Sequence, residues 1–204
     1  MTLALIDIQS GNLHSVENAL RAAGAKDVIV TADPEVILRT DRIVLPGVGA
    51  FGACAANLRA VDGLAEALEG AVLHSGRPFL GVCVGMQLMA EYGEEHGLHE
   101  GLGWIAGTVK ALKPLPGIRV PHMGWNIVQP TTNDTLIEPG EAYFLHSFAY
   151  QCGQRPSAVC AVTDHGGEVV AAVRTGTALG VQFHPEKSQR YGLALLERFL
   201  AWRP

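Results

Sequence analysis

The sequence lacks the features that mark membrane proteins and nucleic-acid-binding proteins. No run of apolar residues approaches the ~20 needed to cross a bilayer as a helix, although 48% of the 204 residues are hydrophobic. The 15 Lys and Arg residues form no cluster and are outnumbered by 20 Asp and Glu, for a net charge of -5. Binding to nucleic acid requires a basic patch. We therefore expect neither a membrane protein nor a nucleic-acid partner.

Cysteine is scarce, and no Cys-x-x-Cys pair occurs. The four cysteines are scattered: Cys54, Cys83, Cys152 and Cys160. A chain of this length buries a full core without cross-links, so we expect them to be reduced. The N-terminal segment, residues 1–8, has no basic leader and predicts a buried strand rather than a signal peptide. Together these features indicate a cytoplasmic protein.

The alternation of apolar and amphipathic segments predicts an α/β fold in a single domain, residues 1–204. The first half favours strands and helices wound around a parallel sheet. The strands are expected at 3–8, 28–30, 43–45 and 79–82, and the helices at 13–23, after Asp33, at 64–75 and at 85–92. The second half is β-rich, with strands expected at 104–112, 125–128, 143–150, 158–162, 169–174 and 179–183 before a helix at 192–202. We expect an open, mostly parallel sheet flanked by helices.

The segment Gly81-Val82-Cys83-Val84-Gly85 has the glycine spacing of a nucleophile elbow, a strained turn from a strand into a helix. Glycines on both sides remove side chains that would clash in so tight a turn. A thiol at a helix N-terminus also favours its thiolate form. An isolated cysteine is more often an inert core residue, but the flanking glycines favour Cys83 as the nucleophile.

A base for this thiol is offered by His184 in Phe183-His184-Pro185-Glu186, which directly follows an apolar strand. Residues two apart on an extended backbone share a face, so Glu186 can orient the imidazole while His184 moves the proton. Alone, the pair would be a loop histidine beside a solvated glutamate. With the elbow, it predicts a catalytic triad.

Hydrogen-bond donors for an oxyanion are expected from two backbone segments. The N–H of Val84 follows the nucleophile, and the loop Pro46-Gly47-Val48-Gly49 ends the third strand, where the N–H of Val48 or Gly49 could turn inward. An ordinary flexible turn explains this loop about equally well.

The sequence offers no convincing cofactor or metal site. Residues 47–52 match Gly-x-Gly-x-x-Gly, but they do not open the first βαβ unit, and Val72 stands where a ribose-binding acid is expected. His96 and His99 have no partner at metal-ligand spacing and are expected to be solvated loop residues. We expect no cofactor and no metal.

Two segments together carry a family resemblance: the elbow with the following Met86-Gln87, and His184-Pro185-Glu186. In both, the sequence resembles the class I (triad) glutamine amidotransferases. Within that family it is similar to the glutaminase subunits of imidazole glycerol phosphate synthases, over nearly the whole chain. The matching segments are Gly11-Asn12-Leu13, Pro46-Gly47-Val48-Gly49-Ala50-Phe51, Pro121-His122-Met123-Gly124-Trp125-Asn126, His146-Ser147-Phe148 and Lys187-Ser188.

The resemblance implies that glutamine forms a thioester on Cys83 and is released as glutamate and ammonia. It also implies that Gln87 and Glu95 hold the glutamine, while Ser147 and Phe148 lie along it; relatives often carry Tyr in place of Phe148. The implied partner is a (β/α)8-barrel cyclase of histidine biosynthesis, which makes imidazole glycerol phosphate and aminoimidazole carboxamide ribotide. The implied partner-facing residues are Trp125, Tyr143 and Lys187.

Three other interpretations remain open from the residues. The chain could serve a synthase that makes anthranilate or a nucleotide, although the segment 121–126 argues against that. It could be a stand-alone cysteine hydrolase or peptidase on a related fold. It could also be a regulatory subunit that kept the fold, although the intact triad argues against this.

Overall fold

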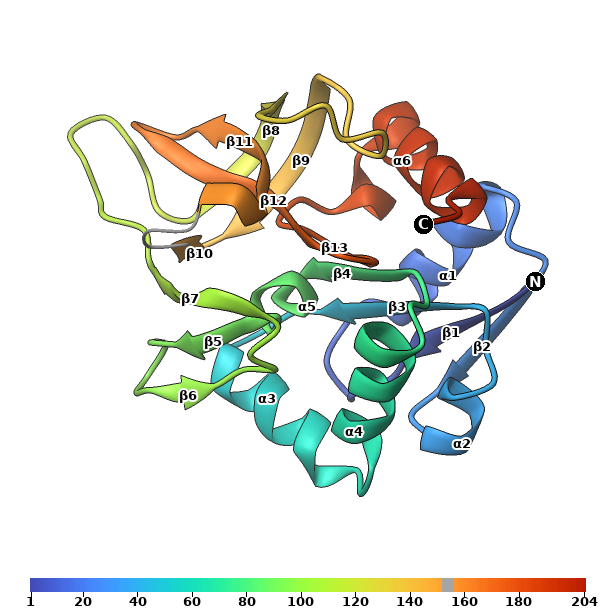
Figure 1. Cartoon of the computed structure of the whole chain (residues 1–204). Coiled ribbons are helices and arrows are strands. Elements are labelled where there is room, and N and C mark those ends of the chain that lie inside the picture. The colour runs from blue at the N-terminus through green and yellow to red at the C-terminus, as the bar shows by residue number, and fades with distance from the viewer. Residues whose placement is uncertain (152–155) are drawn as a thin grey trace.

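A nine-stranded sheet runs through the computed structural model of the chain (Figure 1). The structure describes residues 1–151 and 156–204. The strands in spatial order are β2 (Asp27–Thr31), β1 (Thr2–Ile6), β3 (Arg42–Gly47), β4 (Phe79–Cys83), β13 (Ala178–Val181), β12 (Glu168–Thr175), β11 (Val159–Asp164), β8 (His122–Pro130) and β9 (Gly140–His146). A second sheet has the order β10 (Phe148–Gln151), β7 (Ile105–Ala111), β5 (Ala90–Gly93) and β6 (His99–Glu100).

Helices cover both faces of the large sheet. The helical segments are α1 (Leu13–Ala22), α2 (Pro34–Ile37), α3 (Phe51–Ala60), α4 (Leu64–Glu69) with its π-helical continuation η1 (Gly70–His74), α5 (Val84–Gln87), the 3-10 turns η2 (Pro156–Ala158) and η3 (Pro185–Lys187), and α6 (Gln189–Ala201). Helices α1 and α6 pack together on one face, whereas α2, α3 and α4 lie on the other (Figure 1). The predicted start of α2 is confirmed, because the Asp33 side chain accepts a hydrogen bond from the N–H of Glu35 and Pro34 is the first helical residue.

The predicted α/β class is confirmed, and the sheet changes character along its width. Strands β2, β1, β3, β4 and β13 run parallel, while β13, β12, β11, β8 and β9 pair antiparallel. The parallel order therefore holds for the first-half strands and β13, and the β-rich second half adds the antiparallel part. Strands β3 and β4 are buried along their whole length, as expected for parallel strands covered on both faces.

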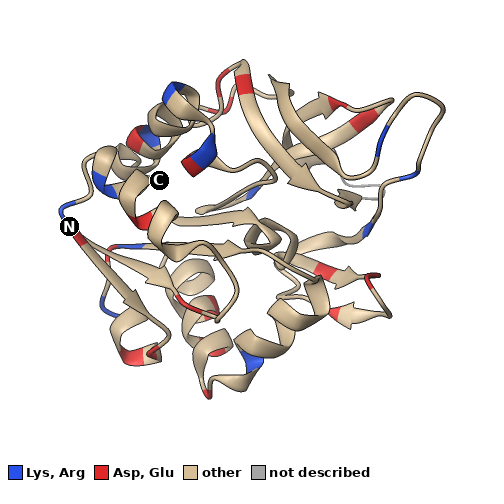
Figure 2. Ribbon diagram, turned by 180° about the vertical axis from the view of Figure 1, so that it is seen from behind, with Lys and Arg blue, Asp and Glu red and all other residues tan. Residues whose placement is uncertain are grey.

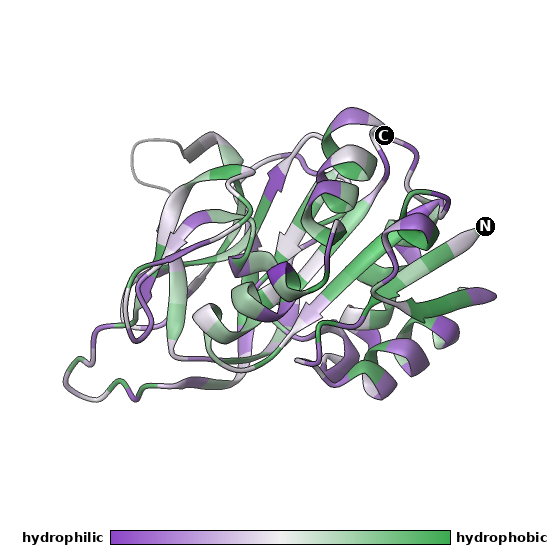
Figure 3. Cartoon of the chain, turned by 90° about the horizontal axis from the view of Figure 1, so that it is seen from below, coloured by the Kyte–Doolittle hydropathy of each residue, from purple (hydrophilic) through white to green (hydrophobic). Residues whose placement is uncertain are grey.

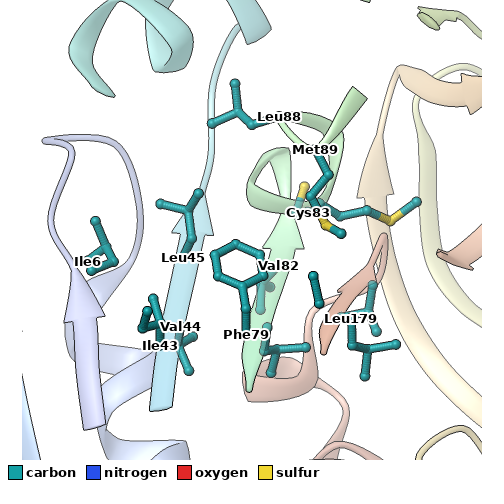
Figure 4. Packing of buried hydrophobic residues seen from close by; sticks show 14 of the residues in the cluster. Ile6, Ile43, Val44, Leu45, Phe79, Val82, Cys83, Leu88, Met89 and Leu179 are labelled. Carbon is teal, nitrogen blue, oxygen red and sulfur yellow. The ribbon is translucent and has the colours of Figure 1, made fainter. Parts of the chain in front are cut away.

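The core lies between the parallel strands and their helices. Figure 4 shows Leu45, Phe79, Val82 and Leu179 packed around the strand that carries Cys83. Seen from below, the central strands are hydrophobic and the hydrophilic residues gather on the outer helices and loops (Figure 3). Basic and acidic residues are interspersed over the surface (Figure 2). Among the described residues, no helix is both long and apolar enough to span a membrane.

The prediction of a helix over residues 85–92 is wrong. Helix α5 ends at Gln87, and the chain enters β5 at Ala90. Residues 102–105 take the backbone acceptors that a longer helix would use: Leu102 donates to the carbonyl of Leu88, and Ile105 to that of Met89. Tertiary pairing with this later segment therefore overrides the local helical pattern.

Three smaller expectations also need correction. The segment 143–150 is two strands in different sheets, β9 and β10, separated at Ser147. Residues 51–60, where no helix was expected, form helix α3. His99 lies in β6 and is half-buried against Gly52, whereas His96 is exposed as expected.

Candidate active site

Cys83 occupies a strained turn at the carboxyl end of β4. It is the last residue of that strand and directly precedes α5, with φ 54° and ψ -110°, a conformation that a non-glycine residue rarely adopts. A Cβ on Gly81 would lie 2.5 Å from the carbonyl oxygen of Gly85, and a Cβ on Gly85 would lie 1.9 Å from that of Leu45. The two glycines thus permit the close backbone approach that the elbow pattern indicated.

Gly85→Ala is expected to destabilise the chain by about 3 kcal/mol or more, because the new methyl group would collide with the rigid backbone of β3. Gly70→Ala is the matched control: Gly70 has φ -59° and ψ -43°, and its Cβ site is 3.9 Å from the nearest side-chain atom, Leu38 Cδ2. We expect this control to be neutral or to stabilise by about 0.4–1 kcal/mol. Chemical denaturation measures both, and equal stability of the two variants would contradict the packing account.

His184 and Glu186 form a buried pair. The Nδ1 atom of His184 lies 2.8 Å from Oε1 of Glu186, and the two side chains are 2% and 3% exposed. The pair meets although Pro185–Lys187 is a 3-10 turn and not the extended strand assumed from the sequence. The other carboxylate oxygen, Oε2, has no hydrogen-bond partner among the described residues, so the carboxylate acts mainly on the imidazole.

The environment of His184 favours its charged form. Burial alone would lower the pKa, but hydrogen bonds and charge interactions with Cys83 and Glu186 outweigh it and raise the pKa of His184 to about 9. At neutral pH, a positively charged imidazolium therefore stands beside the sulfur of Cys83. This charge favours a thiolate, which is the nucleophilic form of cysteine.

A cavity of about 270 Å³ opens in front of Cys83. It brings together the predicted nucleophile, base, oxyanion segments and substrate contacts: Val48, Gly49, Cys83, Val84, Gln87, Glu95, Ser147, Phe148 and His184. Pro121, Leu145 and His146 complete its lining. Residues from both halves of the chain thus meet at the carboxyl ends of β3 and β4, where ligands bind in α/β sheets.

The loop that follows β3 closes over the elbow. A Cβ on Gly47 would lie 2.9 Å from the backbone nitrogen of Gly85, and Gly49 has φ 107°. The Cys54 thiol donates to the carbonyl of Val48 at 3.6 Å. The loop is therefore held next to Cys83 by contacts on both sides, with a glycine where the backbone turns.

The two side chains that the resemblance assigned to substrate also have contacts within the protein. Glu95 accepts a hydrogen bond from the N–H of Phe51 at 2.7 Å through one carboxylate oxygen. The Nε2 atom of Gln87 donates to the carbonyl of Phe148 and to Oε1 of Gln182, both at 3.0 Å. Because both amide hydrogens of Gln87 are committed, only its Oε1 is left to meet a ligand.

Sequence reasoning missed two buried histidines, His122 and His146, the second of which lines the cavity. His146 donates through Nδ1 to the carbonyl of Phe148 (2.9 Å), and its Nε2 lies 2.9 Å from Nδ1 of His122. Burial lowers the pKa of His146 to about 4 and that of His122 to about 3, so both rings are neutral at pH 7. Since a carbonyl only accepts, His146 carries its hydrogen on Nδ1, and His122 must donate to it. The residues stand in the motifs 121–126 and 146–148, but nothing local indicated that their rings meet.

The expected partner-facing residues lie in β8, in β9 and in the turn after His184. Trp125 in β8 is 47% exposed and packs edge-on against Tyr143 in β9, with ring centroids 6.1 Å apart. The backbone carbonyl of Tyr143 accepts from the N–H of His184 at 2.9 Å. Lys187 is half-buried in the turn after His184. Tyr143 and Lys187 therefore lie on segments that contact the base directly, and Trp125 lies beside Tyr143 on the neighbouring strand.

No group of three His, Cys, Asp or Glu residues in the described ranges could hold a metal ion. Cys54, Cys83 and Cys160 are free thiols; Cys152 lies outside the described residues.

Comparison with known proteins decides the family. The model of the family "Glutamine amidotransferase class-I" matches residues 4–202. The chain is 56% identical to imidazole glycerol phosphate synthase subunit HisH of Zymomonas mobilis subsp. mobilis, covering 100% of this chain and 97% of that protein. It is 50% identical to the same subunit of Caulobacter vibrioides, with 100% and 99% covered. The chain belongs to the HisH group of class I glutamine amidotransferases.

Solved structures agree with the fold of this amidotransferase. A crystal structure titled as a glutamine amidotransferase matches with a TM-score of 0.74 at 17% identity, covering 98% of both chains. PurLQS from Thermotoga maritima matches with a TM-score of 0.70 at 16% identity, covering 98% of this chain and 97% of that one. At such low identities these likenesses show the fold alone, and the full-length relatives carry the finer grouping.

Proposed function

We propose that this amidotransferase hydrolyses glutamine to glutamate and ammonia at Cys83, and that the ammonia passes to a cyclase that makes imidazole glycerol phosphate and aminoimidazole carboxamide ribotide. The observation that carries the proposal is the convergence of the elbow cysteine, the buried His184–Glu186 pair and the cavity lining on one point. The names of the full-length relatives support the choice of synthase. A nucleophilic free thiol also fits a reducing compartment, and we infer a cytoplasmic enzyme.

In the proposed reaction, the Cys83 thiolate attacks the side-chain amide carbon of glutamine. His184, already protonated, gives its proton to the departing nitrogen, and ammonia leaves a thioester on Cys83. Neutral His184 then takes a proton from the water that attacks the thioester, and glutamate is released. Glu186 holds the ring and stabilises the imidazolium without transferring a proton.

The negative oxygen that forms in each step needs hydrogen-bond donors. Val84 supplies the N–H that follows the nucleophile, and the peptides around Val48 and Gly49 supply the second donor when one of them turns toward the cavity. Gly47 and Gly49 allow this turn at little steric cost. We infer that the loop has two orientations and that only one of them is active.

The cavity suits the charged end of a free amino acid. The second carboxylate oxygen of Glu95 and Oε1 of Gln87 are both acceptors, which fits the ammonium group of glutamine. Ser147 and Phe148 also line the cavity. Phe148 brings no hydroxyl group, so that side chain contributes shape only.

The surface beside the cavity suits a protein partner. Alternate residues of β8 and two of their partners in β9 are apolar and point outward. We call this set the β8–β9 face, and it consists of Met123, Trp125, Ile127, Tyr143 and Leu145. Met123 is 65% exposed and Ile127 52% exposed, although isolated apolar side chains are more usual on a monomer surface. We infer that the (β/α)8-barrel cyclase covers this face, with Lys187 at its edge, and receives ammonia from the adjoining cavity.

Trp125→Glu is expected to weaken binding of the cyclase at least tenfold, because buried aromatic residues dominate interface energies. Leu73→Glu is the matched control: Leu73 is 43% exposed, similar to Trp125 at 47%, but it lies in η1, which precedes the amino end of β4. Titration calorimetry with the cyclase measures both. An equal loss of affinity in the two variants would argue against the β8–β9 face as the docking site.

Steady-state glutaminase rates test the proposed function. They are compared for the chain alone, with cyclase, and with cyclase plus ribotide. Losing one oxyanion donor costs roughly 10² to 10³ in rate, so we expect a gain of that order when the ligand-bound cyclase favours the active loop. Equal rates in all three samples would contradict the switching of the loop, and broad amide cleavage without a partner would favour a stand-alone hydrolase.

A further inference from the structure

Gln182 lies level with the nucleophile on the neighbouring strand. Strands β13 and β4 run parallel with Val181 opposite Val82, so the next residues along, Gln182 and Cys83, adjoin at the carboxyl end of the sheet. Gln182 is fully buried, with 0% of its surface exposed. It precedes His184 by two residues, and the side chains of both residues contact Cys83.

The orientation of the Gln182 amide is set by its neighbours. The carbonyl oxygen of Phe148 can only accept, so the amide of Gln87 presents Nε2 to it. The same Nε2 lies 3.0 Å from Oε1 of Gln182, so Gln182 must accept there. Its own Nε2 is then directed at the sulfur of Cys83, 3.6 Å away. A buried amide left without partners would be costly, and this arrangement satisfies both ends of Gln182.

The sulfur of Cys83 lies beside one hydrogen-bond acceptor and one hydrogen-bond donor. On one side, the Leu145 carbonyl oxygen, 3.9 Å from Sγ, can accept only from a protonated thiol. On the other side, the N–H of Gln182 becomes a stronger partner when the sulfur is negative. Gln182 therefore favours the thiolate and fixes its place in the elbow.

We propose that Gln182 is a positioning residue that holds the Cys83 sulfur as a thiolate facing the cavity, and that Gln87 orients Gln182 for this task. The proposal rests on the proposed function in that it gives this thiolate the role of nucleophile. It adds to Gln87 a role in the reactivity of the sulfur, besides contact with substrate.

The rate at which iodoacetamide alkylates Cys83, measured from pH 5 to pH 10 by mass spectrometry of the Cys83 peptide, tests the proposal without glutamine or cyclase. Gln182→Met keeps the length of the side chain and removes the N–H donor. We expect the midpoint of its profile to rise by about one pH unit, with roughly tenfold slower alkylation at neutral pH. Gln87→Met should shift the profile in the same direction by less, because Gln182 loses only its orienting partner.

Thr163→Val is the control, since Thr163 is another buried polar residue of the same sheet and its hydroxyl has no hydrogen-bond partner among the described residues. Its profile should match that of the unaltered chain. If Gln182→Met does not fold, Gln182→Glu decides: it keeps an acceptor for Gln87, places a negative oxygen beside the sulfur and should raise the midpoint further. A folded Gln182 variant with an unshifted profile overturns the proposal, even if glutamine hydrolysis is confirmed. A shifted profile in a chain that cannot hydrolyse glutamine even with cyclase and ribotide present would support it and refute the proposed function.

Discussion

Cys83→Ala is expected to lower glutamine hydrolysis by a factor of at least roughly 10³, because the nucleophile is removed and not merely weakened. The fold should survive, since Cys83 ends β4 at the wall of a cavity and the change is to a smaller side chain. Cys83→Ser should be similarly inactive, because a hydroxyl group is far harder to ionise than a thiol.

A labelling experiment identifies the nucleophile among the cysteines. Burial raises the pKa of the Cys54 thiol and raises that of Cys160 to about 12, so both stay protonated and unreactive at neutral pH. A glutamine-analogue electrophile should therefore label Cys83 alone. Cys54→Ala, which leaves the elbow intact, is the control and should still be labelled. An adduct on Cys54, Cys152 or Cys160 in the unaltered chain would overturn the assignment.

His184→Asn is expected to be nearly as damaging as the loss of Cys83. The variant removes the positive charge beside the sulfur and the proton that the departing ammonia needs. Glu186→Gln should cost less, because the carboxylate only orients and stabilises the imidazolium. The amide of Gln can still bond to the ring, although it favours the wrong tautomer.

The order of these two variants is the decisive comparison, and it is read from kcat with saturating glutamine and cyclase present. A larger loss for Glu186→Gln than for His184→Asn would show that the roles of the two residues are wrongly divided. Because both side chains are buried, each variant could also lose activity by misfolding. Unchanged thermal unfolding of both variants excludes that cause.

The parts of the fold that the sequence predicted well are those set by local pattern. The apolar runs of β1, β3 and β4 are buried on both faces, and such runs are recognisable one by one. The helix expected at 85–92 failed because its backbone acceptors pair with residues 102–105. Helix α3 was missed although Phe51, Cys54, Ala55 and Leu58 have helical spacing, because the glycines before it favour a loop.

The features of the candidate site also differ in whether a local pattern could predict them. Cys83 and His184 could be found because each stands in a short motif whose glycines or spacing have a local physical meaning. The Gln182 contact depends on the register between β13 and β4, and the pair His122 and His146 on the register between β8 and β9. Strand register between distant segments cannot be read from either segment alone.

Transfer of nitrogen from glutamine to the cyclase product is the central claim, and isotope tracing tests it most directly. The chain and the cyclase are supplied with ribotide, glutamine labelled with heavy nitrogen at its side-chain amide, and an excess of unlabelled ammonium in the medium. We expect the imidazole glycerol phosphate formed to carry the label at the enrichment of the glutamine, and the label to vanish with Cys83→Ala. A product whose nitrogen matches the unlabelled ammonium pool would contradict the account.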